Sequence, residues 1–303
     1  MTDGIGVDVA GDMLEDVVVE VVEGPPPADA AGLRRDVFVG EQGVDPVAEA
    51  DALDAAATHA VVRGEDGAVL ATGRLLDPGG ELARGRVARM AVSRERRGGG
   101  YGAIALRALE GAARHRGLVG IELHAQEQAA GFYSRHGYVT RGEPYLEQSI
   151  VHVTMTRDWL PGIRAVTDDD AAAVQELIGG CFAEYEGCVL DVDGIDAWMR
   201  APATADDRTM WVVPGPDGRL TASVGHAHGE LKNLYVTASA RGRGFGESLV
   251  RVAERAGAVR LWSDTRFTDA HRLYDRLGWR RTGEGRDLHD PSDTTEWEFA
   301  RDA

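Results

Sequence analysis

Two arginines each introduce a short glycine-rich stretch whose residues suit the binding of an anion. The first stretch starts at Arg97 and the second at Arg241, and both read Arg-x-x-Gly-x-Gly. A helical pattern follows each stretch, and the free backbone N–H groups at a helix start attract negative charge. Glycine lets that backbone approach a bulky group because no Cβ intervenes. The chemistry that this pattern predicts is the binding of a pyrophosphate.

We assign six consecutive residues of each stretch to this anion site. They are Arg97, Gly98, Gly99, Gly100, Tyr101 and Gly102 in the first stretch, and Arg241, Gly242, Arg243, Gly244, Phe245 and Gly246 in the second. Two other readings exist. One is a plain tight turn, which would need the same coincidence twice. The other is a dinucleotide-binding G-x-G-x-x-A fingerprint, but the residues SRERR separate the first stretch from its strand and the second stretch breaks the spacing.

The glycine stretches belong to a repeat that covers most of the chain. Arg97 and Arg241 are 144 positions apart, and the segments GFYSRHGY and RLYDRLGW place Tyr133 and Tyr274 at an offset of 141. A chain of 303 residues is long enough for two domains of ordinary size. The segment RDWLPG ends the first copy with a proline, which a helix does not tolerate. We therefore predict domains at residues 1–160 and 161–303.

Each half shows the same order of elements. A strand (17–22 and 162–167) precedes a helix (28–39 and 169–185), and two strands follow, joined by the turn sequences GEDG and GPDG. Next come a strand, the glycine stretch, a helix, a strand, a helix and a final hairpin. This order predicts an α/β fold of the α+β type, with a mixed, mostly antiparallel twisted sheet flanked by helices in each half.

Both halves resemble the GNAT N-acetyltransferase superfamily, whose pyrophosphate loop reads Q/R-x-x-G-x-G/A and whose second motif matches the two tyrosine segments. The first half is also similar to the ElaA-type branch in RRDVFVGEQGVDP, ATGRLL, RVARMAV and GEPYLEQSIVHVTM. The resemblance implies two tandem GNAT domains. It implies that both glycine loops hold coenzyme A and that acetyl-CoA is the acyl donor.

Acetyl transfer to an amine requires the removal of a proton. An alkyl ammonium has a pKa near 10.4, so removing its proton to give the neutral amine costs roughly 4.6 kcal/mol of free energy at pH 7. The resemblance implies that Glu230, at the start of the fourth strand of the second half, is the base. The alternative is an ordinary solvated glutamate. In the first half Arg86 takes this position and cannot be a base.

The resemblance implies two further catalytic parts. A backbone N–H of the fourth strand would polarise the thioester carbonyl, at the residues Met90, Ala91 and Val92 or Leu234, Tyr235 and Val236. Tyr133 and Tyr274 match the tyrosine that protonates the departing thiolate, and the alternative for both is a half-buried core tyrosine. Where the family usually has an asparagine, this sequence has Gln126 and Phe267.

The acceptor site is expected at the first helix, the loop that follows it and the last hairpin, where carboxylates favour a cationic ligand. The opposing reading is a solvated acidic surface. In the first half Glu41, Glu147 and His152 could also replace the missing base. The residues assigned to the acceptor are Glu41, Glu147, His152, Glu184, Tyr185 and Asp191.

The composition narrows the function classes. A net charge of −17 argues against nucleic acid as a partner. The sequence contains no apolar run of membrane-spanning length and no signal-peptide pattern at its start, which predicts a cytoplasmic protein without a membrane partner. The two cysteines form no metal-binding pattern.

We therefore expect an acetyl-CoA-dependent N-acetyltransferase for a small, cationic primary amine, with the second half as the catalyst. The alternatives are a coenzyme A-binding module with one half inactive, a protein lysine or N-terminal acetyltransferase, and an enzyme similar to mycothiol synthase.

Overall fold

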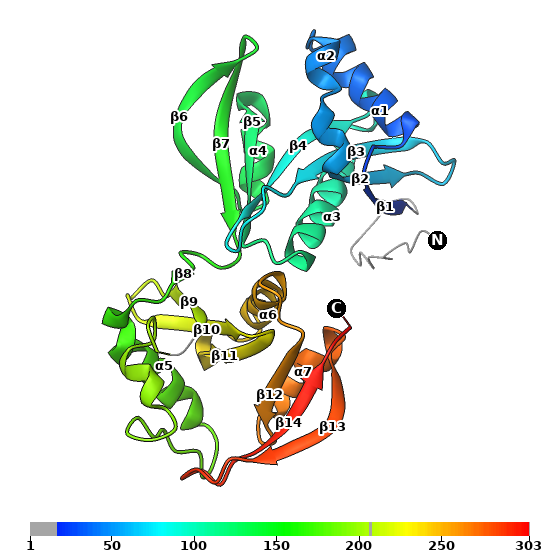
Figure 1. Ribbon diagram of the computed structural model, residues 1–303. Coiled ribbons are helices and arrows are strands. Elements are labelled where there is room, and N and C mark those ends of the chain that lie inside the picture. The colour runs from blue at the N-terminus through cyan, green and yellow to red at the C-terminus, as the bar shows by residue number, and fades with distance from the viewer. Residues whose placement is uncertain (1–16, 206–207, 303) are drawn as a thin grey trace. The chain divides into compact units, whose positions relative to one another are not determined.

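The computed structural model describes residues 17–205 and 208–302 of the chain. The chain divides into two compact units, which we call unit 1 and unit 2 (Figure 1). The boundary between them in the sequence falls between Asp158 and Trp159. Each unit holds one seven-stranded sheet, and in each sheet a single neighbouring pair of strands is parallel while the described remainder is antiparallel. The prediction of two mixed, mostly antiparallel sheets flanked by helices is confirmed.

Unit 1 has the strand order β1-β2-β3-β4-β5-β7-β6. Its strands are β1 (Val18–Glu23), β2 (Thr58–Arg63), β3 (Val69–Leu76), β4 (Arg84–Val92), β5 (Gly120–Gln126), β6 (Val139–Glu147) and β7 (Ile150–Asp158). Its α-helices are α1 (Ala28–Arg35), α2 (Pro46–Glu49), α3 (Tyr101–His115) and α4 (Glu127–Arg135). The helix predicted for residues 28–39 is α-helical only to Arg35 and continues as a wider π-helical turn over Asp36–Glu41.

Unit 2 has the strand order β13-β14-β12-β11-β10-β9-β8. Its strands are β8 (Arg164–Ala165), β9 (Thr209–Pro214), β10 (Leu220–Ala227), β11 (Glu230–Val236), β12 (Arg260–Asp264), β13 (Arg280–Asp287) and β14 (Thr295–Ala300). Its α-helices are α5 (Ala171–Phe182), α6 (Phe245–Arg255) and α7 (Thr268–Arg276). Across both described stretches of the chain, no helix is long and apolar enough to cross a membrane.

Helix α5 shows how the sequence pattern builds the core of unit 2. Its buried residues follow the spacing i, i+3, i+4 and i+7 of one helix face, and they are Val174, Leu177, Ile178 and Cys181. This face packs against the buried side chains of Met199, Met210 and Val212, the last two of which lie on β9. The packing fixes the first helix of the unit on the sheet that carries the site.

The two parallel strands of each unit separate partway along their length. In unit 1, β4 pairs with β5 only from Arg84 to Val87, although β4 continues to Val92. In unit 2, β11 pairs with β12 only at Glu230 and Leu231, although β11 continues to Val236. Beyond these points each pair of strands leaves an opening in the sheet, and both glycine loops follow the separated strand.

A bulge marks the point of separation in both units. Arg89 in β4 has a φ of 54° and Asn233 in β11 has a φ of 53°, a left-handed conformation that residues with side chains seldom adopt. The register of β4 against β3 and of β11 against β10 shifts at the same places. The Arg89 guanidinium donates to the carbonyl oxygens of Ala48 and Glu49 at 2.6 and 3.1 Å, which ties the bulge to the segment that faces it.

That segment, residues 42–57, is fixed by a buried ionic network. Arg34, with 1% of its side chain exposed, donates to the carboxylates of Glu49 at 2.6 Å and Asp54 at 2.9 Å. Arg74 binds Asp51 at 2.6 Å and Asp54 at 2.7 Å. Burial acts to raise the pKa of Asp54, but the hydrogen bonds from Arg34 and Arg74 hold it below its ordinary value.

Loss of one side chain of this buried ionic network should leave the charges of its partners buried and unpaired. We expect Arg34→Met to lower the free energy of unfolding of unit 1 by about 3–5 kcal/mol. Urea unfolding followed by hydrogen exchange in β2 and β3 measures this change, while tryptophan fluorescence follows unit 2, which holds all six tryptophans. The control is Arg84→Met, because Arg84 is 45% exposed in its pair with Asp158 and should cost about 1 kcal/mol or less. Equal losses in the two variants would contradict the role of the network.

Candidate active site

Unit 2 contains a cleft of about 570 Å³ between its glycine loop, the end of β11 and one face of α7. The loop contributes Arg241, Gly242, Gly244, Phe245 and Gly246, whereas Arg243 lies outside the lining. The predicted strand residues Leu234, Tyr235 and Val236 line the same cleft, as does Tyr185. The cleft therefore brings together the loop and strand segments that the sequence analysis assigned to one ligand.

The loop of unit 2 presents unpaired backbone amides. Gly242 and Gly244 have φ values of 74° and 83°, and a Cβ on either residue would lie in open space. Within the described residues, the amides of residues 242–246 donate to no acceptor, and α6 begins at Phe245. Five free N–H groups at the start of a helix form a site for a phosphate-type anion. The loop geometry thus fits the pyrophosphate of coenzyme A.

The loop of unit 1 has the same backbone form. Gly98 and Gly100 have φ values of 82° and 84°, and α3 begins directly after Gly100. A cavity of about 630 Å³ lies beside it and is lined by Arg97, Met90 and Val92. Ala91 is buried and, like the loop residues 98–102, does not line this cavity. The two units therefore repeat one loop conformation at a helix start.

Each loop arginine is held by a glutamate of the same unit. Arg97 donates to the Val92 carbonyl at 3.3 Å and to Glu41 at 2.9 Å. Arg241 donates to the Val236 carbonyl at 3.1 Å and to Glu184 at 2.8 Å. Sequence analysis assigned both glutamates to the acceptor. Their contacts support a different role, which is to fix the loop arginine beside the end of the separated strand.

A second cavity of unit 2, with a volume of about 290 Å³, is rich in acidic side chains. It shares Leu234, Tyr235 and Phe267 with the first cleft. Among the residues that the structure describes, five carboxylates line it, namely Asp196, Glu230, Asp264, Asp290 and Glu296. We call it the acidic cavity. Glu230 is the predicted base, its side chain is 14% exposed, and its carboxylate accepts a hydrogen bond from Lys232 Nζ at 2.6 Å.

The predicted tyrosines are both buried. Tyr274 lines the acidic cavity, its ring packs against Phe299 at 5.6 Å between centroids, and burial raises the pKa of its phenol. Tyr133 lines the cavity of unit 1, and burial raises the pKa of its phenol to about 12. A phenol already carries its proton at neutral pH, and the raised pKa makes each hydroxyl a weaker acid that gives up its proton only to a stronger base.

Two tryptophans in the acidic cavity already contact guanidinium groups. The Arg208 guanidinium lies 4.2 Å from the centre of the Trp198 ring, and that of Arg286 lies 4.3 Å from the Trp262 ring. Glu296 binds Arg286 at 2.6 Å, yet burial raises the pKa of Glu296 above its ordinary value. Aromatic faces and carboxylates in one cavity suit an organic cation.

Only some of the residues that line this cavity, Glu230 and Tyr274 among them, are predicted from the sequence. Sequence analysis assigned Asp191 to the acceptor, but Asp196 lines the cavity and Asp191 does not. It missed Asp264 and Glu296, which come from β12 and β14 and not from the acidic loops. The alternation of polar and apolar residues in TTEWEFA was the available signal for Glu296, because it places Glu296 and Glu298 on one face of a strand.

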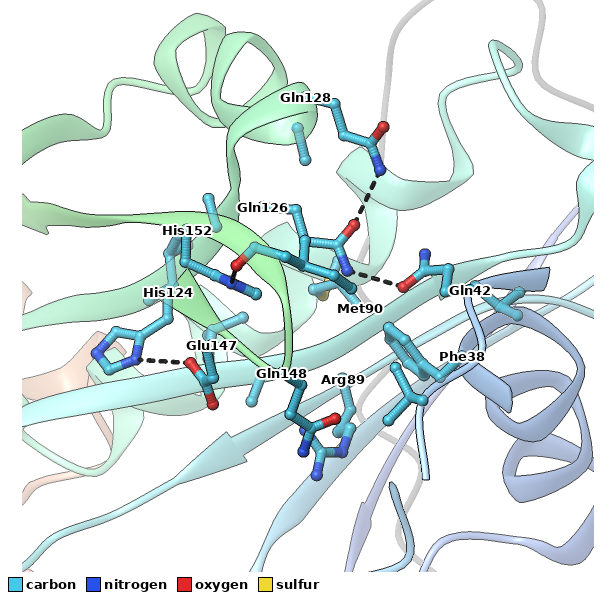
Figure 2. A pocket seen from close by; sticks show the side chains of 18 of the residues that line it. Phe38, Gln42, Arg89, Met90, His124, Gln126, Gln128, Glu147, Gln148 and His152 are labelled. Carbon is cyan, nitrogen blue, oxygen red and sulfur yellow. Dashed lines mark hydrogen bonds and ion pairs between the residues drawn. The ribbon is translucent and has the colours of Figure 1, made fainter. Parts of the chain in front are cut away.

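In unit 1, His152 and Glu147 both line the cavity, together with a histidine that sequence analysis missed (Figure 2). His124 lies on β5, and its Nδ1 is 3.9 Å from the Glu147 carboxylate and 3.1 Å from the Arg86 guanidinium. Because arginine can only donate, Nδ1 is the acceptor in the contact with Arg86. His152 Nδ1 donates to the Ile150 carbonyl at 2.9 Å. Arg86 thus contacts a histidine where unit 2 has Glu230.

A chain of three glutamines also lies in the cavity of unit 1 (Figure 2). Gln128 donates to Gln126 at 3.0 Å, and Gln126 donates to Gln42 at 2.7 Å. Gln126 occupies the position where the family usually has an asparagine, and its amide joins the end of β5 to the segment after the π-helical turn. In unit 2 the matching residue is Phe267, whose ring lies 4.8 Å from that of Tyr185.

Comparison with known proteins adds independent observations. Residues 32–138 match the family model of the acetyltransferase (GNAT) family, and residues 206–281 match that of an acetyltransferase (GNAT) domain. The chain is 38% identical over 132 residues to the uncharacterized N-acetyltransferase YjcF of Bacillus subtilis, which covers 43% of this chain and 91% of that protein. It is 35% identical over 129 residues to UPF0039 protein Mb2876c of Mycobacterium bovis, covering 41% of this chain and 80% of that protein.

Solved structures similar to the chain each match about half of it. An acyl-CoA N-acyltransferase from Pseudomonas aeruginosa is 32% identical and covers 47% of this chain and 99% of its own, with a TM-score of 0.42. Escherichia coli ElaA is 24% identical and covers 47% of this chain and 100% of its own, also with a TM-score of 0.42. With family matches in both units and 38% identity to YjcF over 132 residues, this chain is a member of the GNAT acetyltransferase family, whose acyl donor is an acyl-CoA.

Proposed function

We propose that unit 2 transfers an acetyl group from acetyl-CoA to the primary amine of a small cationic molecule. When bound, acetyl-CoA supplies the acetyl group as a thioester. Its pyrophosphate would be held by the amides of residues 242–246 and by Arg241, because the free N–H groups and the left-handed glycines fit such a group. The amine would enter through the acidic cavity, whose carboxylates attract positive charge.

One observation carries this proposal: the donor cleft and the acidic cavity of unit 2 meet at the same three residues, Leu234, Tyr235 and Phe267. They meet where β11 has separated from β12. A donor approaching from the loop and an acceptor approaching from the acidic side would therefore come together at the separated strand. This arrangement supports a direct transfer between two bound molecules.

Within this site each residue has a separate task. Glu230 receives the proton of the acceptor ammonium, directly or through water. The backbone of β11 at Leu234 and Tyr235 stabilises negative charge at the reacting carbonyl oxygen. Tyr274 lines the acidic cavity and keeps its proton at neutral pH, so it can protonate the departing sulfur. Glu296 and Asp196 hold the positive charge of the acceptor.

Unit 1 has a second candidate function, the binding of coenzyme A without the glutamate base. The observation that favours it is Arg86, which stands at the position of Glu230 and donates to His124 at 3.1 Å. The glycine loop, Arg97 and Tyr133 are all present in this unit. The donor part of the site is therefore kept in both units, and the acceptor part differs.

The glycine loops give the first prediction. Gly244→Ala puts a Cβ in front of the free amides, so the coenzyme A site of unit 2 should weaken by about tenfold or more. Gly100→Ala should do the same in unit 1. Calorimetric titration of coenzyme A into the full chain should then show two sites of parental affinity in the parent and only one in each variant.

A matched control separates this effect from backbone strain. Gly218 lies in the turn between β9 and β10, has a φ of 84° and also faces open space. Gly218→Ala introduces the same strain as Gly244→Ala but should leave both coenzyme A sites intact. Equal weakening by Gly218→Ala would contradict a local role of the loop.

The acid and base assignments give the second prediction. Glu230→Gln should lower kcat for amine acetylation by about 10²–10⁴-fold, because the substrate amine loses the base that takes its proton. Tyr274→Phe should cost about tenfold or less, since a thiolate already leaves readily. Thiol release across a panel of amines measures both, with the surface variant Glu176→Gln as control, whose side chain is 60% exposed. An unchanged rate and pH profile in Glu230→Gln would refute the base assignment.

The raised pKa of Glu296 gives the third prediction. Because its folded-state pKa lies above 4.5, Glu296 gains a proton as the pH falls toward that value, and its attraction for a cation is lost. The affinity for the best amine of the panel should therefore fall with pH in this range. Glu296→Gln should bind the amine more weakly than the parent at pH 8, and the difference between the two affinities should shrink as the pH falls through the raised pKa of Glu296. Calorimetry checks this, and a constant ratio of the two affinities across the range would contradict it.

A further inference from the structure

The chain contains a single lysine, Lys232, and the structure places it in the acidic cavity of unit 2. It lies on β11, two residues after Glu230 and two before Leu234. Leu234 is one of the residues that line both the donor cleft and the acidic cavity. Its side chain is 32% exposed, and Nζ donates to the Glu230 carboxylate at 2.6 Å. The ammonium of Lys232 therefore occupies the place where the amine of an acceptor would meet the base.

Chemistry sets Lys232 apart from the other cations of this cavity. Arg208 and Arg286 also line it, but a guanidinium stays protonated in proteins and offers no amine nucleophile. A lysine amine becomes nucleophilic once a base removes its proton. Lys232 already has Glu230 in hydrogen-bond contact, which is the geometry that proton transfer requires. No other side chain in the sequence carries a primary amine.

We infer that Lys232 is an acyl acceptor of its own unit, so that unit 2 acetylates its own chain at this residue. The inference rests on the proposed function, because it uses the same donor cleft and the same base. The four-carbon arm of lysine lets Nζ turn from Glu230 toward Leu234 and Tyr235, which lie a few residues along the same strand.

The reaction is balanced without a further reactant. The Lys232 ammonium gives one proton to Glu230, and the free nitrogen forms a bond to the acetyl carbonyl carbon while the carbon–sulfur bond breaks. The second proton of the nitrogen goes with the sulfur, which leaves as the thiol, and Glu230 returns its proton to solvent. The product is a neutral amide at Lys232.

Self-acetylation would change the acidic cavity. The positive charge beside Glu230 disappears, so the Glu230 carboxylate loses its internal partner and becomes available to an external cation. Lys232→Gln imitates the neutral amide, and Lys232→Arg keeps the charge but offers no amine. In the absence of any acyl donor, Lys232→Gln should bind the best cationic amine of the panel several-fold more tightly than Lys232→Arg, as measured by calorimetry.

The direct test is the mass of the full-length protein after incubation with acetyl-CoA. We expect one acetyl group on the β11 peptide that contains Lys232, gained at a rate that does not depend on protein concentration, as an intramolecular reaction requires. Glu230→Gln and Gly244→Ala should each slow the modification at least tenfold, and Lys232→Arg should abolish it. Glu176→Gln serves as the control variant and should behave like the parent.

Two results would overturn the inference. One is an unmodified Lys232 in a protein that acetylates free amines, which leaves the proposed function intact. The other is modification at an equal rate in the parent and in Glu230→Gln, which would show spontaneous chemical acetylation. If neither free amines nor Lys232 is acetylated, the proposed function fails together with the inference.

Discussion

The bulge at the centre of each sheet is the constraint on which both sites depend. Arg89 and Asn233 take a left-handed backbone conformation, and the strand beyond each of them no longer pairs with its parallel neighbour. A fully paired sheet would fill this space with backbone hydrogen bonds. The separated strand instead leaves one edge open to a ligand, next to the start of a helix, and in unit 2 the described amides at that helix start donate to no acceptor. The cleft, the loop and the acidic cavity of unit 2 all meet at this edge.

The two units keep the donor part of this arrangement and differ in the acceptor part. Both hold a left-handed glycine pair before a helix, and both fix the loop arginine with a glutamate, Glu41 or Glu184. Carboxylates and tryptophans line the acidic cavity of unit 2, whereas glutamines, two histidines and Arg86 line the cavity of unit 1. The diphosphate that we propose as ligand makes the same physical demands in both units, and this would account for the repeated loop. The acceptors of the two units need not be alike.

Local patterns in the sequence predicted the repeated fold, the glycine loops and both tyrosines, because each depends on neighbouring residues. Hairpin turns, helix periodicity and glycines before a helix are signals of this kind. The contacts of Glu41 and Glu184 could not be found this way, since their partners lie 56 and 57 positions away in the chain. The bulge at Arg89 was missed because arginine at a positive φ has no sequence signature, and that at Asn233 because the preference of asparagine for a positive φ does not by itself mark a bulge. Asp264, Glu296 and His124 were missed because only the sheet topology brings separate strands to one cavity.

The central claim is that the backbone amides of the two glycine loops bind the diphosphate of coenzyme A. Hydrogen exchange followed by mass spectrometry tests it directly, in the full chain with and without coenzyme A. Bound coenzyme A should slow the exchange of the amides of residues 242–246, which donate to no acceptor within the described residues, and of Gly98, Gly100 and Gly102 in the loop of unit 1. Unchanged exchange in both loops at saturating coenzyme A would contradict it.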